Sequence, residues 1–152
     1  IYESVLIKHQ VVLQDPKEQG LRKILNFGHT LGHAIESYSL AHRCKRLLHG
    51  EAVAIGMILA AFLSHKVINF SWKQVEEIKT TLLEYFPQEE FSPDEIKAIL
   101  ELLKYDKKNV YGHIYFVLLK EIGVSQWNME VEESFIQEAF VYYMTPLSEN
   151  KH

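Results

Sequence analysis

The sequence is poor in cysteine and has no excess of basic residues. Its single cysteine, Cys44, excludes an internal disulfide framework and suits a reducing compartment, so we expect a cytoplasmic protein. Lysine and arginine total 16 against 20 acidic residues, which gives a formal net charge of -4. No basic stripe with interleaved aromatic residues is present, so we expect no nucleic-acid partner.

Long hydrophobic runs are also missing. The longest, residues 52–63, has only twelve residues, which is too short to span a membrane and suits a buried helix. Glu3 and Lys8 interrupt the apolar start of the chain, so no signal peptide is expected there. We therefore expect no membrane partner.

The sequence contains no GxGxxG after a strand and no parallel βαβ pattern, which excludes a dinucleotide-binding fold of that type. The 152 residues, 47% of them hydrophobic, suit one globular domain with a true core. Because the chain begins without Met and already in a helical pattern, we expect it to be a piece of a longer protein.

Hydrophobic periodicity predicts a mainly α fold, a multi-helix domain with one small β hairpin. A largely buried helix is expected at residues 1–13, and Asp15-Pro16, with Glu18 three positions on, resembles the start of a second helix that fades near residues 39–41. Residues 42–48 are expected to form an exposed loop. Further elements are predicted as helices at residues 52–67, 72–85, 93–103 and 132–144, and as strands at residues 112–119 and 124–129.

One stripe of polar residues stands out within the second predicted helix. Arg22, Asn26, His29, His33 and Glu36 follow one another at spacings of 4, 3, 4 and 3. On a helix these side chains fall within an arc of roughly 80°. A solvent-exposed face would mostly carry Lys and Glu, whereas Arg, Asn and His bind anions, coordinate metals and move protons. The stripe is therefore typical of a functional site.

His29 and His49 could meet, because they lie near the starts of consecutive predicted helices. The eight residues 41–48 can span up to about 26 Å when extended, more than the roughly 17 Å that a helix rises from His29 to Leu40, so the chain can return alongside the first helix. Two helix N-termini would then point at one spot and favour an anion. The pair could bind a metal together with a third ligand, or the two imidazoles could simply be satisfied by carbonyls and carboxylates.

The residues around the stripe closely resemble 3-dehydroquinate synthase. The resemblance is carried by two blocks, Arg22-x-x-Leu25-Asn26-Phe27-Gly28-His29-Thr30-x-Gly32-His33-Ala34-x-Glu36 and Leu48-His49-Gly50-Glu51-Ala52-Val53-Ala54-x-Gly56-Met57. It extends upstream to Lys8 and Asp15-Pro16-x-Glu18-x-Gly20-Leu21-Arg22, and downstream to Asp106-Lys107-Lys108, Phe116-Val117-Leu118-Leu119 and Ile122-Gly123. The similarity thus covers the chain nearly end to end.

This resemblance implies that residues 1–152 form the single, helical C-terminal domain of such an enzyme, with the N-terminal NAD-binding domain absent from this chain. The family converts 3-deoxy-D-arabino-heptulosonate 7-phosphate to 3-dehydroquinate and phosphate in the shikimate pathway. Its members use NAD and a divalent metal, usually Zn²⁺ (or Co²⁺), and commonly dimerise. The implied partners are a phosphorylated sugar acid and the chain's own N-terminal domain.

The resemblance also implies roles for single residues. His29 and His49 match two metal ligands, and Glu18 and His33 match proton acceptors. The third metal ligand, a Glu, belongs to the other half of the family's enzymes. We therefore expect the isolated 152 residues to bind metal weakly and not to turn over substrate.

Four further residues match substrate-binding positions of the family: Lys8, Arg22, Asn26 and Lys107. A substrate with a carboxylate and a phosphate explains the need for cations, because Arg suits bidentate recognition of a carboxylate and Lys provides a point charge for phosphate.

Three other readings of the chain are open. A related sugar-phosphate cyclase, such as one that makes 2-deoxy-scyllo-inosose from glucose 6-phosphate, would share the fold, but Lys8 and Arg22 favour a substrate with an acid group. A metal-dependent polyol dehydrogenase would lack the Arg22 and Asn26 part of the stripe. A non-catalytic partner-binding domain would more often show aromatic anchors than a row of histidines.

Overall fold

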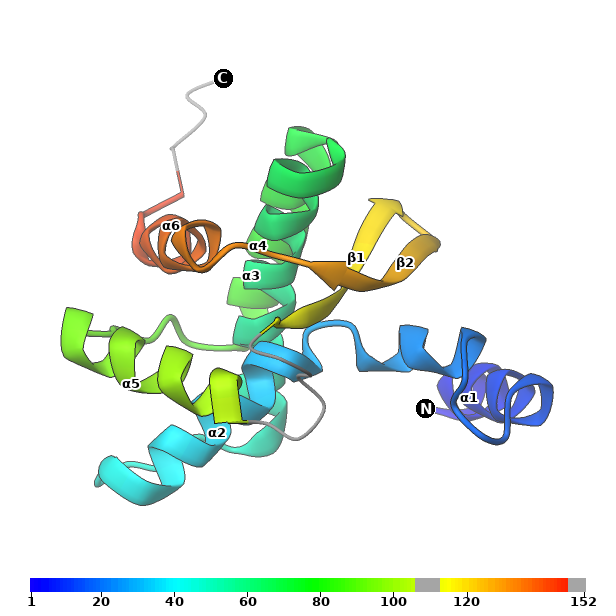
Figure 1. Cartoon of the computed structure of the whole chain (residues 1–152), viewed down its shortest axis with the longest axis horizontal. Coiled ribbons are helices and arrows are strands. Elements are labelled where there is room, and N and C mark those ends of the chain that lie inside the picture. Colours follow the sequence, from blue (N-terminus) through cyan, green and yellow to red (C-terminus); the bar gives the residue numbers. More distant parts are fainter. Residues whose placement is uncertain (106–112, 148–152) are drawn as a thin grey trace.

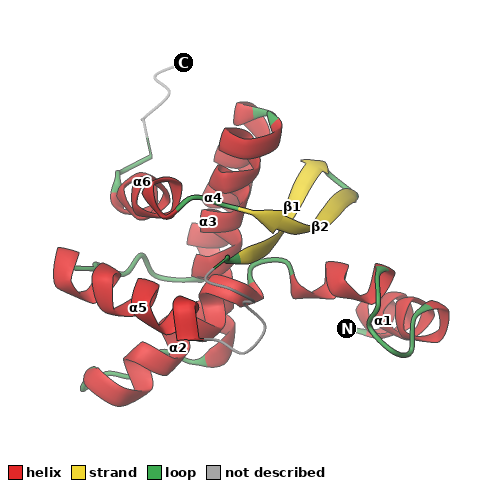
Figure 2. Ribbon diagram, viewed as in Figure 1, coloured by secondary structure: helices red, strands yellow, loops and turns green. Residues whose placement is uncertain are grey.

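The computed structural model describes residues 1–105 and 113–147, and over these ranges it is mainly helical with one β hairpin (Figure 2). This confirms the predicted fold class. In chain order the elements are α1 (Tyr2–Gln14), the 3₁₀ helix η1 (Leu21–Asn26), α2 (His29–His42), α3 (His49–Ile68), α4 (Trp72–Tyr85), α5 (Pro93–Tyr105), β1 (Tyr115–Glu121), β2 (Val124–Glu130) and α6 (Glu133–Met144).

Helix α3 is the central element of the fold (Figure 1). It packs against α2, α4, α6 and β1, and most residues between Ala52 and Ser64 are buried. By length and composition alone α3 could cross a membrane, but 61% of its most apolar window is buried inside the fold. Such burial is what a core helix of a multi-helix domain requires.

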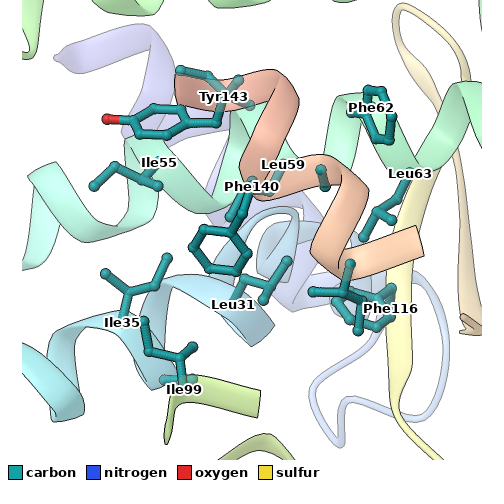
Figure 3. Close-up of a cluster of buried hydrophobic side chains, with 14 of the residues drawn as sticks. Leu31, Ile35, Ile55, Leu59, Phe62, Leu63, Ile99, Phe116, Phe140 and Tyr143 are labelled. Carbon is teal, nitrogen blue, oxygen red and sulfur yellow. The ribbon is translucent and has the colours of Figure 1, made fainter. Parts of the chain in front are cut away.

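The hydrophobic core is assembled on α3 from side chains of α2, α4, α5, β1 and α6, most of them drawn in Figure 3. Each of its large apolar side chains contributes roughly 1.5–3 kcal/mol of burial free energy. The principal members are Leu31 and Ile35 of α2, Ile55, Leu59 and Leu63 of α3, Ile99 of α5, Phe116 of β1, and Phe140 and Tyr143 of α6. This core fixes how α2, the hairpin and α6 lie around α3.

Helices α2 and α3 touch through their backbones, because glycines face one another where they cross. A Cβ atom on Gly56 would lie 2.0 Å from the carbonyl oxygen of Gly28 and 2.8 Å from the amide nitrogen of Gly32. A Cβ on Gly28, whose φ is 78°, would come within 2.9 Å of the Met57 backbone. Only glycine permits this separation, and Gly28 also supplies the left-handed turn that opens α2.

The two strands pair antiparallel, with Phe116 opposite Met129 and Leu118 opposite Gln126. They are joined at Gly123, whose φ of 85° suits the tight turn. Phe116 and Leu118 are buried toward α3. The predicted hairpin is confirmed, although β1 begins at Tyr115.

The prediction of a largely buried first helix was wrong. Over the described residues α1 buries only Val11, and Tyr2, Val5, Ile7 and Leu13 are all more than half exposed. The helix extends from the body of the molecule beside η1 (Figure 1). Apolar spacing alone does not reveal whether a surface of this chain covers those side chains.

The prediction of one continuous helix from Asp15 to about residue 40 was also wrong. The Asp15 carboxylate accepts hydrogen bonds from the backbone N–H groups of Gln19, Gly20 and Arg22 at 3.0, 2.8 and 3.0 Å, which organises a turn in place of a helix cap. The stripe is then divided between η1 and α2, with the break at Gly28.

The connection between α2 and α3 is mostly exposed, as predicted, but two of its residues anchor it to the fold. Leu47 is only 4% exposed, and its N–H donates to the buried Ser39 Oγ at 2.8 Å. Arg43 donates to the carboxylates of Glu89 and Glu95 at 3.1 and 3.0 Å. These contacts fix the chain just before α3 begins.

Candidate metal and substrate site

Three histidines gather on the surface where α2 and α3 run side by side. The ring centroids of His29 and His49 lie 6.0 Å apart, and His33 lies 5.3 Å from the first and 5.7 Å from the second. One ligand atom from each ring lies within 4.8 Å of the other two. The structure therefore brings together the two histidines predicted as a pair and adds His33 to them.

Hydrogen bonds set the tautomers of two of these rings. His29 Nδ1 lies 3.2 Å from the carbonyl oxygen of Phe27, and His49 Nδ1 lies 3.0 Å from Glu36 Oε2. Because carbonyl and carboxylate oxygens only accept, Nδ1 must carry the proton in both contacts. In the neutral rings the lone pair is then on Nε2, as a metal ligand requires.

This donor set fits a divalent metal of the zinc type. Neutral imidazoles are preferred zinc ligands, and two nitrogens on one tetrahedral ion at about 2.1 Å lie about 3.4 Å apart. The ligand nitrogens of the cluster lie within 4.8 Å of one another, and rotation of the rings can shorten these distances to that spacing. His33 and His49 are exposed and His29 is half-buried, so the cluster also leaves an open side for a substrate.

The two helices run antiparallel here, which corrects one expectation. The start of α3, at His49, contacts Glu36 well inside α2, whereas Met57, further along α3, contacts Gly28 at the start of α2. The N-terminus of α3 therefore lies beside Glu36, which is about 10 Å along α2 from His29, the first residue of α2. The imidazoles meet, but the two helix N-termini do not point at one spot.

Glu18 and Asn26 form a polar pair next to the cluster. Asn26 Nδ2 donates to Glu18 Oε1 at 2.6 Å. Glu18 has a φ of 53°, a left-handed conformation that turns the chain between α1 and η1. The alternative role of Glu18 as a helix cap is excluded, because no helix starts at Asp15.

Two cavities adjoin the cluster and share Glu18, Asn26 and His29. The smaller, about 330 Å³, is lined by Lys8, Glu18, Arg22, Leu25, Asn26 and His29. The larger, about 510 Å³, includes Lys17, Lys23, Thr30, His33, Trp127 and Asn128. Each cavity therefore has two cationic side chains in its lining; His29 lines both cavities, and His33 lines the larger one.

Of the predicted substrate-binding residues, Lys8, Arg22 and Asn26 line the smaller cavity. Arg22 Nη1 donates to the carbonyl oxygen of Pro16 at 3.1 Å, which holds the guanidinium beside the turn. Lys107 lies outside the described residues.

The larger cavity contains residues that sequence reasoning missed. Lys23 Nζ donates to Asn128 Oδ1 at 3.2 Å, and Trp127 packs against Gly20. Trp127 and Asn128 come from β2, about a hundred residues from the stripe, and no local pattern signals this contact. Glu36, by contrast, lies on the predicted stripe, and its spacing could have indicated a place beside the histidines.

The fold and the site together define a helical domain with a histidine cluster of metal-ligand geometry beside two cavities that each contain two cationic side chains. A profile of the family described as 3-dehydroquinate synthase C-terminal matches residues 1–109. The chain belongs to this family.

Curated relatives bear the same name. The chain is 41% identical over 141 residues to the 3-dehydroquinate synthase of Parabacteroides distasonis, a match that covers 93% of this chain and 40% of the relative. It is 44% identical over 136 residues to the enzyme of Dictyoglomus turgidum, covering 90% and 37%. The chain therefore spans about two fifths of the length of these relatives.

Two solved synthase structures share the fold. A 2-deoxy-scyllo-inosose synthase complexed with carbaglucose-6-phosphate, NAD⁺ and Co²⁺ matches with a TM-score of 0.64 and 25% identity, over 81% of this chain and 35% of that one. A 2-epi-5-epi-valiolone synthase from Streptomyces hygroscopicus with NAD⁺ and Zn²⁺ bound also gives a TM-score of 0.64, at 23% identity over 93% and 37%.

Proposed function

We propose that this chain provides the metal-binding and part of the substrate-binding machinery of an enzyme that converts 3-deoxy-D-arabino-heptulosonate 7-phosphate to 3-dehydroquinate and phosphate. The observation that carries the proposal is the cluster of His29, His33 and His49 beside the Glu18–Asn26 pair. The family and the names of the curated relatives support it. The proposal concerns the longer enzyme, and we expect the 152 residues alone to release no phosphate.

The cations beside the cluster suit a substrate with two acidic groups. Arg22 would bind the carboxylate, because its planar guanidinium matches two carboxylate oxygens, and Lys8 on α1 would add a second charge in the same cavity. Asn26 would donate to a substrate oxygen from the boundary between the two cavities. Lys107 is proposed to contribute to substrate binding on the strength of the family resemblance.

Glu18 and His33 are proposed to take up protons from the substrate. Asn26 holds the Glu18 carboxylate by a 2.6 Å hydrogen bond, so one oxygen is fixed and the other can act as a base. His33 is exposed and lines the larger cavity, next to both proposed ligands. An imidazole in that place can exchange protons at neutral pH.

His29 and His49 would hold a divalent metal, which when bound would act as a Lewis acid toward a substrate hydroxyl. The second cofactor of such an enzyme, NAD, finds no matching site in the described residues. Within residues 1–105 and 113–147 the only sheet has two antiparallel strands, which cannot form the parallel βαβ unit that binds dinucleotides. We therefore assign NAD binding to the N-terminal domain that the family resemblance implies.

Zinc titration of the 152-residue chain tests the metal site. We expect one Zn²⁺ per chain, with binding weakened at least tenfold by His29→Ala or His49→Ala. The control is His42→Ala, at the exposed C-terminal end of α2, which should bind zinc like the parent. Unchanged zinc affinity in both His29→Ala and His49→Ala would refute the proposed ligands.

A second candidate is a sugar-phosphate cyclase that acts on glucose 6-phosphate, favoured by the structural likeness to 2-deoxy-scyllo-inosose synthase. Binding of the two substrates to the zinc-loaded chain, measured by chemical-shift changes, separates the candidates. If the carboxylate is recognised, the sugar acid should bind more tightly, and Arg22→Gln should remove most of the difference. Tighter binding of glucose 6-phosphate would favour the second candidate.

A further inference from the structure

Glu36 makes a specific contact with one of the proposed metal ligands. Its Oε2 atom lies 3.0 Å from His49 Nδ1 and joins α2 to the first residue of α3. Glu36 lies seven residues after His29 and three after His33, so the same stripe of α2 carries all three side chains. The carboxylate therefore stands behind the cluster, on the Nδ1 side of the His49 ring.

The contact gives the exposed His49 ring a hydrogen-bond partner on the neighbouring helix. The His49 side chain is 57% exposed, whereas that of Glu36 is 26% exposed, so the carboxylate is the less exposed of the two. An exposed side chain at the first turn of a helix samples several rotamers unless a hydrogen bond selects one. His29 has its own acceptor, the backbone carbonyl of Phe27, which side-chain substitution cannot remove.

A second carboxylate lies close to His49 in sequence but has another task. Glu51 Oε2 accepts the backbone N–H of Leu48 at 2.7 Å and thereby caps the start of α3. The two glutamates thus have different roles, since Glu51 caps the start of α3 and Glu36 contacts the imidazole of His49. This division supplies a matched control.

We propose that Glu36 is a positioning residue that fixes the Nδ1–H tautomer and the ring orientation of His49, so that Nε2 is presented for a divalent metal. The inference rests on the proposed function, because it takes His49 to be a ligand. Carboxylates that accept from a ligating histidine typically raise metal affinity by about 10–100-fold.

The tautomer is tested without metal. Long-range ¹H–¹⁵N spectra of the metal-free chain at pH 8, where an ordinary imidazole is neutral, distinguish Nδ1–H from Nε2–H. We expect His49 in the Nδ1–H form in the parent, in Glu51→Ala, and largely in Glu36→Gln, whose amide oxygen can still accept. Glu36→Ala should lose this form. An unchanged His49 tautomer in Glu36→Ala would overturn the inference.

The metal is tested next, by competition for Zn²⁺ with a chromophoric chelator. Glu36→Ala should bind zinc about 10–100-fold more weakly than the parent, Glu36→Gln should lie between the two, and Glu51→Ala should stay within about threefold of the parent. Equal losses in Glu36→Ala and Glu51→Ala would overturn the inference, because they would indicate general loosening of the start of α3.

The two tests also separate this inference from the proposed function. If the parent binds zinc but Glu36→Ala binds it equally well, the metal site stands and the role of Glu36 is refuted. If the tautomer depends on Glu36 but the parent binds no zinc, the proposed metal site fails, and the contact is a structural link between α2 and α3 only, which also overturns the inference.

Discussion

Gly56 and Gly28 lie in direct backbone contact, since a Cβ atom at Gly56 would be 2.0 Å from the Gly28 carbonyl oxygen. This contact sets the distance between α2 and α3 and therefore the distance between the histidines that they carry. The site thus depends on a packing feature that contains no functional side chain.

The first prediction concerns this contact. Gly56→Ala should destabilise the chain by about 3 kcal/mol or more, because the added methyl group meets backbone atoms that cannot move aside. It should also weaken zinc binding by separating the helices. Urea unfolding and zinc titration measure the two effects.

The control for that substitution is Gly50→Ala in the first turn of the same helix. A Cβ at Gly50 would meet nothing within 4 Å, so alanine should be neutral or stabilise by up to about 1 kcal/mol through its higher helix propensity. Similar losses of stability in both variants would show that the helix crossing is not the cause.

The second prediction concerns the buried hydrogen bond from Leu47 N–H to Ser39 Oγ. Ser39→Ala should lower the free energy of unfolding by about 1–3 kcal/mol, because it leaves a buried N–H without an acceptor. Ser71→Ala is the control, since Ser71 precedes α4 without a side-chain cap hydrogen bond. If chemical denaturation gives the two variants equal stability, the bond contributes nothing measurable.

The third prediction concerns Arg43, which joins the end of α2 to the chain before and within α5. Its guanidinium donates to Glu89, Glu95 and the Glu90 carbonyl, and it lies 4.7 Å from the centre of the Phe91 ring. Lysine cannot make these planar contacts together, so Arg43→Lys should cost about 1–2 kcal/mol.

Arg46→Lys, at an exposed position of the same connection, provides the comparison for Arg43→Lys. It should leave the urea midpoint within experimental error of the parent. A larger shift for Arg46→Lys than for Arg43→Lys would contradict the assigned role of the Arg43 guanidinium.

The fourth prediction is a pH dependence that originates at Asp15. Hydrogen bonds from the backbone N–H groups of Gly20, Arg22 and Gln19 lower the pKa of its carboxyl group in the folded chain. A depressed folded pKa stabilises the fold above the unfolded value near 3.9, and this stabilisation is lost as the pH falls through the folded pKa. Stability should therefore decline on acidification below about pH 5.

Asp15→Asn removes this titration. The variant should be less stable than the parent at pH 7, and the difference should shrink as the pH approaches the folded pKa of Asp15. Unfolding curves at several pH values from 7 to 3 measure the difference. A constant difference over this range would mean that the Asp15 carboxylate has no net preference for the folded chain.

Much of the fold follows from local sequence signals. Helix α4 begins and ends where Ser71 and Pro87 predict it, and the apolar run at residues 52–63 forms the buried part of α3. The failures have tertiary causes. The helix break lies at Gly28, where α2 passes close to the backbone of Met57, and α1 is exposed because no other element packs over most of its apolar side chains in the described part of the chain.

The site was predictable as a set of residues but not as a geometry. The spacing of the stripe indicated Asn26, His29, His33 and Glu36 as neighbours, whereas the approach of His49 depends on a glycine crossing between two helices. The contribution of β2 had no sequence signal, because it comes from pairing and packing of distant segments.

The glycine crossing has a consequence for how this scaffold tolerates change. Main-chain atoms hold the two helices together, and the imidazoles lie at exposed or half-buried positions outside that backbone contact. Cysteine or carboxylate donors could replace them one at a time while the glycine contact between α2 and α3 is kept. The metal selectivity of the cluster can therefore be altered by changing these side chains, separately from the packing of α2 on α3 that stabilises the fold.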